Sequence, residues 1–145
     1  MITTAFLDTG FYLSIGHPDD LNSVRGDLLL EEIETKKFGI LFTSNAIVEE
    51  LMLLAWVRTK GNETIIQDIE SLIWGDQRLA KIIYIDEYIL NETQRAFLKY
   101  NKDVRSKEEF LSFVDVSSVI ICEKYKLEQI FSFDAHFDRF LTRIY

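Results

Sequence analysis

Four short runs of apolar residues alternate along the chain with longer, more polar segments. They cover residues 4–8, 39–44, 81–86 and 129–134. Most of these runs are almost continuously apolar, which is typical of strands covered on both faces of a parallel sheet. The C-terminal residues "FLTRIY" could add a strand at the edge of the same sheet.

The segments between these runs have the spacing of helices, at about residues 20–37, 45–60, 64–75, 87–103 and 108–125. Strands that alternate with helices predict an α/β fold with three layers, α/β/α, and a central, mostly parallel sheet of four to five strands. No internal repeat, linker or low-complexity tract interrupts the pattern, so we expect residues 1–145 to form a single domain.

Composition agrees with a globular chain, since 48% of the residues are hydrophobic and 13% are aromatic. The single cysteine, Cys122, excludes an internal disulfide and most cysteine-based metal sites. The N-terminal residues do not resemble a signal peptide, and no apolar run approaches the roughly 18 residues of a membrane span. We therefore expect a soluble, cytoplasmic protein.

The formal charge of -8 argues against one class of function. A protein that binds nucleic acid without metal is usually basic, because neutralised phosphates supply much of the affinity. The charge therefore disfavours a passive nucleic-acid binder, but it leaves a metal-dependent nuclease open.

Aspartates stand at the ends of three predicted strands, where α/β sheets place their sites: Asp8, Asp86 and Asp134. A single aspartate at such a position is commonly a helix N-cap. Asp86 fits that interpretation, because the helical segment "EYILNETQRAFLKY" follows it. Asp8 and Asp134 remain candidates for a functional site.

Two predicted helices contribute further carboxylates. Glu50, unlike Glu49, has only apolar residues at its helical neighbour positions and no basic residue on that face. An inward carboxylate of this kind needs a positive partner, and a metal would supply one. Asp115 likewise lies among apolar and small residues, although it could instead be a polar residue near a helix start, bonded to Ser112 or to a backbone group.

If the first and last of the four strands are neighbours, the four carboxylates line one crevice: Asp8, Glu50, Asp115 and Asp134. Clustered carboxylates stay ionised with hard cations such as Mg²⁺ or Mn²⁺, which prefer oxygen ligands. Such a site can activate water and stabilise an in-line displacement at a phosphodiester.

Three segments resemble, in order and spacing, the motifs of PIN-domain ribonucleases, above all VapC-like toxins of bacteria and archaea: "FLDTGFYLSI", "FTSNAIVEELMLL" and "LSFVDVSSVIICEKYKLEQIFSFDAHF". With "IDEYILNETQRAFLKYNKD", the resemblance covers nearly the whole chain. It implies a parallel sheet between helices, a divalent metal, endonucleolytic cleavage of RNA, a small antitoxin that covers the site, and a homodimer.

The family's acidic positions fall on the same four residues. The resemblance implies that Asp8, Asp115 and Asp134 hold the metal, while Glu50 completes the site or orients the attacking water. Thr9 and Ser117 match small hydroxyl positions that support the carboxylates by hydrogen bonds.

Other polar and aromatic residues have simpler interpretations. We expect His136 and Asp138 to be bystanders on the surface, and Trp56 and Trp74 to lie in the core or an interface. A basic stretch predicts a solvated loop and helix face, or alternatively a contact with the RNA backbone: Lys99, Lys102, Arg105 and Lys107.

The leading hypothesis is thus a metal-dependent endoribonuclease that acts as the toxin of a toxin–antitoxin pair. The alternative is a catalytically weak PIN domain that binds RNA or supports an assembly, which the four acidic residues disfavour because they repel phosphate. A phosphoryl-accepting domain is disfavoured because "DTG" lacks a second aspartate, and dinucleotide binding because no glycine-rich turn follows the first strand.

Overall fold

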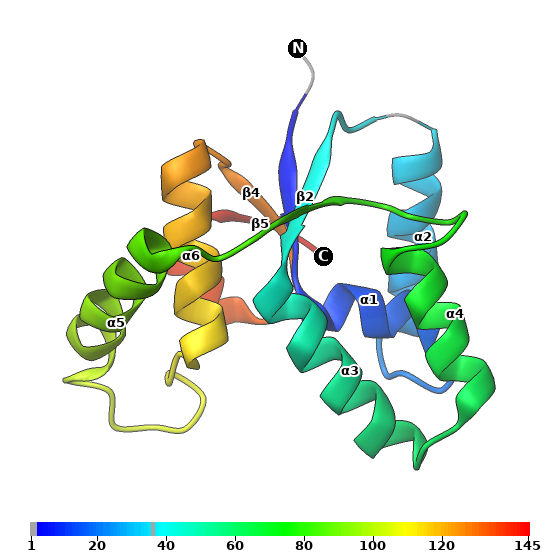
Figure 1. Ribbon diagram of the computed structural model, residues 1–145, viewed down its shortest axis with the longest axis horizontal. Helices are drawn as coiled ribbons and strands as arrows, with labels where there is room; N and C mark the ends of the chain where they lie inside the picture. The colour runs from blue at the N-terminus through cyan, green and yellow to red at the C-terminus, as the bar shows by residue number, and fades with distance from the viewer. Residues whose placement is uncertain (1–2, 36) are drawn as a thin grey trace.

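A five-stranded parallel sheet forms the centre of the computed structural model, which describes residues 3–35 and 37–145 (Figure 1). The strands are β1 (Ala5–Leu7), β2 (Leu41–Ser44), β3 (Lys81–Ile83), β4 (Gln129–Phe131) and β5 (Thr142–Ile144). Their order is β3-β2-β1-β4-β5, and every pairing is parallel. The predicted parallel sheet and the edge strand from the C-terminal residues are confirmed.

Among the described residues, six helices and one 3-10 helix surround the sheet: α1 (Thr9–Gly16), α2 (Ser23–Glu34), α3 (Asn45–Thr59), α4 (Glu63–Ile73), α5 (Glu87–Asn101), α6 (Phe113–Tyr125) and η1 (Ala135–Arg139). In Figure 1, α5 and α6 pack together on one side of the sheet, and α1 to α4 lie on the other. This arrangement confirms the three-layer α/β/α fold.

The central strand β1 determines where the carboxyl ends of the strands meet. All three of its residues are fully buried, and it pairs with β2 on one side and with β4 on the other. Parallel strands end at the same edge of a sheet. The residues that follow β1 and β4 therefore lie side by side. A shared crevice for the four carboxylates depended on these two strands being neighbours.

Helix α1 is an element that the sequence pattern did not predict. Its buried residues lie all around the helix, so it lacks the polar face that makes a helix recognisable by its period. The helix predicted over residues 20–37 is shorter, Ser23–Glu34, and position 36 lies outside the described residues.

The predicted strands are also too long at their carboxyl ends. Asp8, Asp86 and Asp134 each follow a strand and occupy the N-cap position of the next helix. Only the Asp86 side chain caps its helix, by accepting a hydrogen bond from the N–H of Ile89 at 2.9 Å. The interpretation of Asp86 as an N-cap is confirmed.

Within the described ranges, no helix is both long and apolar enough to cross a membrane.

Helices α1 and α2 pack closely at Gly26, where a Cβ atom would lie 2.7 Å from the Cβ of Ser14 and 3.1 Å from its backbone carbonyl carbon. Gly26→Ala should therefore lower the free energy of unfolding by about 1–3 kcal/mol, the usual cost of overpacking. Urea denaturation measures the change.

Gly10→Ala is the matched control, because a Cβ at that position would meet only the Phe133 ring at 3.9 Å. We expect Gly10→Ala to be at least as stable as the wild type, since alanine favours the helix. Equal stabilities of Gly26→Ala and the wild type would contradict the close packing of α1 on α2.

Candidate functional site

A cavity of about 210 Å³ opens at the carboxyl ends of β1 and β4. Its lining comes from the start of α1, from α3, from the start of α6 and from the residues after β4: Asp8, Thr9, Gly10, Leu13, Glu50, Leu54, Arg58, Ser112, Asp115 and Asp134. The structure thus brings the four predicted carboxylates to one cavity, and α3 and α6 contact each other beside it.

Asp8 is the most buried of these carboxylates, with 3% of its surface exposed. Its backbone N–H donates to the carbonyl of Phe131, and its Oδ2 accepts a hydrogen bond from Ser132 Oγ at 2.7 Å. Burial raises the pKa of Asp8 to about 7, the bond from Ser132 opposes that shift, and the charges of Asp115 and Asp134 add to it. The carboxyl is therefore poised between its neutral and ionised forms near neutral pH.

Ser132 joins Asp8 to Asp134, since its hydroxyl also accepts a hydrogen bond from the backbone N–H of Asp134 at 3.1 Å. Asp134 itself is exposed at the cavity rim. The sequence interpretation missed Ser132, whose only signal is a hydroxyl inside the apolar run "QIFSFD". From its position directly after β4, its hydroxyl orients the Asp8 carboxylate and holds the backbone of Asp134.

Glu50 lies in the second turn of α3 and is half-buried, whereas Glu49 is exposed, in agreement with the choice between them. Thr9 Oγ1 donates to Glu50 Oε2 at 2.5 Å, as expected for the small hydroxyl after the first aspartate. Burial raises the pKa of Glu50, and the Thr9 bond and the Arg58 charge oppose that rise. The expectation that this face has no basic residue is wrong, because Arg58 lines the cavity too.

Asp115 forms a capping box with Ser112 at the start of α6. Its backbone N–H donates to Ser112 Oγ at 3.0 Å, and its Oδ2 accepts from the N–H of Ser112 at 2.9 Å. The local contacts of Asp115 therefore match the alternative interpretation, in which it is a polar residue bonded to Ser112 at the start of a helix. Asp115 nevertheless lines the cavity, so the cap fixes the carboxylate beside the other three.

His136 is not the surface bystander that the sequence predicted. Its side chain is 15% exposed, and its Nε2 lies 3.5 Å from Asp115 Oδ2. Burial lowers the pKa of His136, but the contact with Asp115 and the charges of Asp134 and Asp8 outweigh that effect and raise it. The turn of η1 places this ring against the carboxylates, which linear sequence could not show. Asp138 does lie on the surface, paired with Arg143 Nε at 3.0 Å.

Ser117 does not support a carboxylate in this structure. Its hydroxyl donates to the carbonyl of Val114 at 2.7 Å, a common bond for a serine inside a helix. Trp56 and Trp74 are 61% and 56% exposed, so their assignment to the core is wrong, while an interface role stays a prediction. The four residues of the basic stretch are exposed, as a solvated surface requires.

The lining of the cavity fits a hard cation in its donor chemistry, because its carboxylates and hydroxyls offer only oxygen atoms. A cation would also favour the ionised form of Asp8. Across the described residues, however, no three His, Cys, Asp or Glu side chains have the mutual spacing of a formed metal site.

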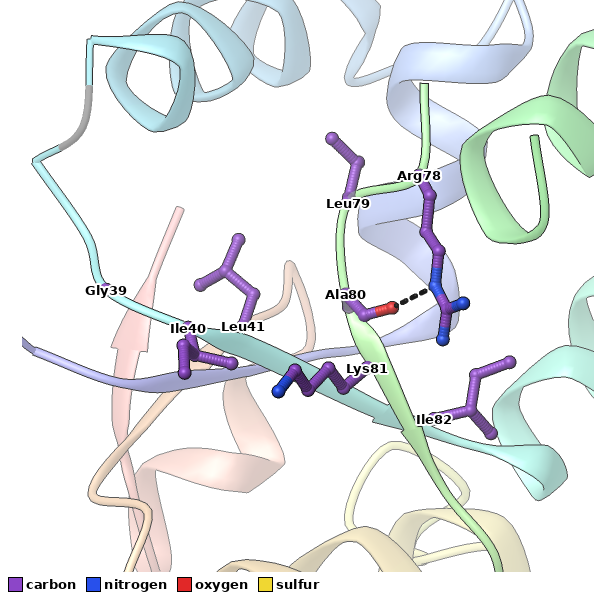
Figure 2. Close-up of a pocket in the computed structure, with 8 residues that line it drawn as sticks. All are labelled: Gly39, Ile40, Leu41, Arg78, Leu79, Ala80, Lys81 and Ile82. Carbon is purple, nitrogen blue, oxygen red and sulfur yellow. Dashed lines mark hydrogen bonds between the residues drawn. The ribbon is translucent and has the colours of Figure 1, made fainter. Parts of the chain in front are cut away.

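A larger depression of about 650 Å³ follows the β2–β3 edge at the amino ends of those strands (Figure 2). It is lined by residues 39–41 and 78–82, and Arg78 Nε donates there to the carbonyl of Ala80 at 3.1 Å. These lining residues include no acid, histidine, cysteine, serine or threonine. The smaller cavity is therefore the candidate functional site.

Solved structures with this fold include two that match nearly the whole chain. Mycobacterium tuberculosis VapC20, described as a sarcin-ricin loop cleaving toxin, is 18% identical with a TM-score of 0.75 over 93% of each chain. FitAcB from Neisseria gonorrhoeae is 17% identical with a TM-score of 0.63, over 97% of this chain and 96% of that chain. The resemblance to VapC-like PIN domains is thus confirmed at the level of the fold. No protein-family model and no curated protein matches the sequence.

The raised pKa of Asp8 predicts how stability depends on pH when divalent cations are chelated. The carboxyl keeps its proton up to about pH 7 in the folded chain but only to about 3.8 in the unfolded chain. The folded state therefore binds more protons between these values, and stability falls as the pH rises through them.

Asp8→Asn removes this dependence and should be more stable than the wild type at pH 8, by at most about 4 kcal/mol. Urea denaturation across pH 4–8 in a chelator measures the difference. The exposed Asp138→Asn is the control and should follow the wild type. If the wild-type and Asp8→Asn curves run parallel over this range, Asp8 does not titrate as described.

Proposed function

We propose that this chain is a metal-dependent endoribonuclease that hydrolyses phosphodiester bonds in RNA. The observation that carries the proposal is the convergence of four carboxylates on one cavity at the carboxyl edge of the sheet: Asp8, Glu50, Asp115 and Asp134. These residues come from four separate segments of the chain, and ordinary helix capping accounts for only one of them, Asp115.

Asp8, Asp115 and Asp134 would hold Mg²⁺ or Mn²⁺, and Glu50 would complete the site or orient the attacking water. The cation supplies a Lewis acid that activates water and stabilises charge on the phosphodiester. The chain's own residues fix the geometry: the Ser132 hydroxyl orients Asp8, and the Thr9 hydroxyl orients Glu50. Asp8 would have to be ionised to hold the cation, because a ligating carboxylate cannot keep its proton.

The alternative of an RNA-binding or assembly module without catalysis is less well supported. A buried carboxyl whose pKa is raised to about 7 disfavours folding at neutral pH, and clustered negative charge repels phosphate. Neither property helps passive RNA binding. Carboxyl groups with shifted pKa values that converge in a cavity are instead typical of catalytic sites.

We further propose that the protein is the cytoplasmic toxin of a toxin–antitoxin pair. The support is the fold that it shares, over 93% of both chains, with VapC20, which is described as a sarcin-ricin loop cleaving toxin. A small antitoxin would then inhibit it by covering the cavity, and the chain would form a homodimer. Three apolar side chains on α3 are more than half exposed and available to a protein partner: Leu53, Trp56 and Val57.

Cleavage of labelled total RNA with Mn²⁺ or Mg²⁺ tests the enzymatic proposal. Asp8→Asn and Asp115→Asn should each reduce the cleavage rate by more than the roughly 10–100-fold that loss of an outer hydrogen-bond partner costs. Asp138→Asn, an exposed carboxylate outside the cavity, should cut like the wild type. Cutting that survives both cavity substitutions, or that needs no divalent cation, would contradict the site.

Ser132→Ala tests the role of the hydroxyl that links Asp8 to Asp134. We expect cleavage to fall by about 10–100-fold, because the Asp8 carboxylate loses its hydrogen-bond donor and the backbone N–H of Asp134 loses its acceptor. Ser118→Ala removes an equally buried hydroxyl that bonds the Val114 carbonyl, so it should cut at the wild-type rate. Equal rates for the two variants would show that Ser132 is not needed to position the acids.

A further inference from the structure

Arg58 is the only cation among the described residues that line the carboxylate cavity. It lies near the end of α3, on the same stripe as Glu50 and Leu54, which precede it by eight and four positions. Residues four apart on a helix share a face, so this stripe runs along one wall of the cavity.

Arg58 lines the same cavity as the acids, although its backbone lies farther along α3. Eight residues of helix separate the Glu50 and Arg58 backbones by roughly 12 Å along the axis. Long helical side chains lean toward the helix N-terminus, however, and so shorten that separation. The Arg58 charge accordingly opposes the rise in the pKa of Glu50.

Asp20 anchors the guanidinium at the cavity rim. Its Oδ2 lies 3.8 Å from Arg58 Nη1, and its other carboxylate oxygen accepts a hydrogen bond from the N–H of Asn22 at 2.8 Å. The Asp20 side chain is 8% exposed and Arg58 is 50% exposed. A separation of 3.8 Å is longer than a charge-assisted hydrogen bond, so the pair positions Arg58 without saturating its donors.

We propose that Arg58 binds a phosphate of the RNA strand on the α3 side of the cavity, an inference that rests on the proposed nuclease function. A guanidinium offers a planar pair of donors that matches two phosphate oxygens. A chain with a formal charge of -8 also needs a local cation to accept a polyanion beside four carboxylates. The remaining donors of Arg58 supply that contact at the open rim.

The test combines two measurements on the full-length chain. One is the KM and kcat for cleavage of a short, end-labelled single-stranded RNA with Mn²⁺ over a series of KCl concentrations. The other is binding of the same RNA in a chelator, measured by fluorescence anisotropy. The variants are Arg58→Ala, Arg58→Lys and Arg95→Ala, of which the last removes an exposed cation on α5 as the control.

Arg58→Ala should raise KM by about ten- to a hundred-fold, the usual effect of losing a hydrogen bond to a charged group. The slope of log KM against log salt should fall by about 0.7, the share of one phosphate contact on a single strand. Arg58→Lys should keep the slope and give an intermediate KM, because lysine retains the charge but not the planar fork. Arg95→Ala should have the same KM and the same salt dependence of KM as the wild type.

The outcomes separate the phosphate contact from the nuclease function. If the wild type cuts RNA and Arg58→Ala keeps its KM and salt slope, the contact is refuted and the nuclease stands, even if the pH profile of kcat shifts. If the wild type binds RNA through Arg58 but cuts none with either cation, the contact stands and the nuclease is refuted. A wild type that neither binds nor cuts RNA refutes both.

Discussion

The parallel pairing of β1 with β4 is the constraint on which the candidate site depends. Its register sets Leu7 opposite Phe131, so the next residues, Asp8 and Ser132, meet at the edge of the sheet. The hydroxyl of Ser132 then donates a hydrogen bond to the Asp8 carboxylate and accepts one from the backbone N–H of Asp134. Two acids from opposite ends of the chain are thereby fixed beside one another, and α3 and α6 close around them.

Burial and like charge give this arrangement its chemical character. Asp8 and Glu50 both have raised pKa values, first because they are withdrawn from water and then because Asp115 and Asp134 lie near them. Hydrogen bonds from Ser132 and Thr9 offset only part of that effect, so the cavity favours any ligand that brings positive charge. The same negative charge repels phosphate, so a contact with RNA at this cavity needs a neighbouring cation.

The sequence predicted the elements whose patterns are local. Buried parallel strands appear as apolar runs, and the acids at their ends could be placed at one edge once β1 and β4 were taken as neighbours. The contacts made by single side chains could not be predicted, because they depend on partners distant in sequence. Ser132 was placed inside a strand and His136 on the surface, and Arg58 was overlooked because the face of Glu50 was expected to hold no basic residue. Trp56 looked buried because its helical neighbours are apolar, yet that face of α3 is exposed.

Calorimetric titration of Mn²⁺ into the wild type and into Asp8→Asn near pH 7 tests the central claim most directly. If the four carboxylates form one cation site, the wild type binds Mn²⁺ and releases protons, since Asp8 must ionise to ligate. Asp8→Asn then loses most of the binding, and the exposed Asp138→Asn keeps both the binding and the proton release. Equal binding of Mn²⁺ by the wild type and Asp8→Asn, or no binding by the wild type at millimolar metal, would contradict the account.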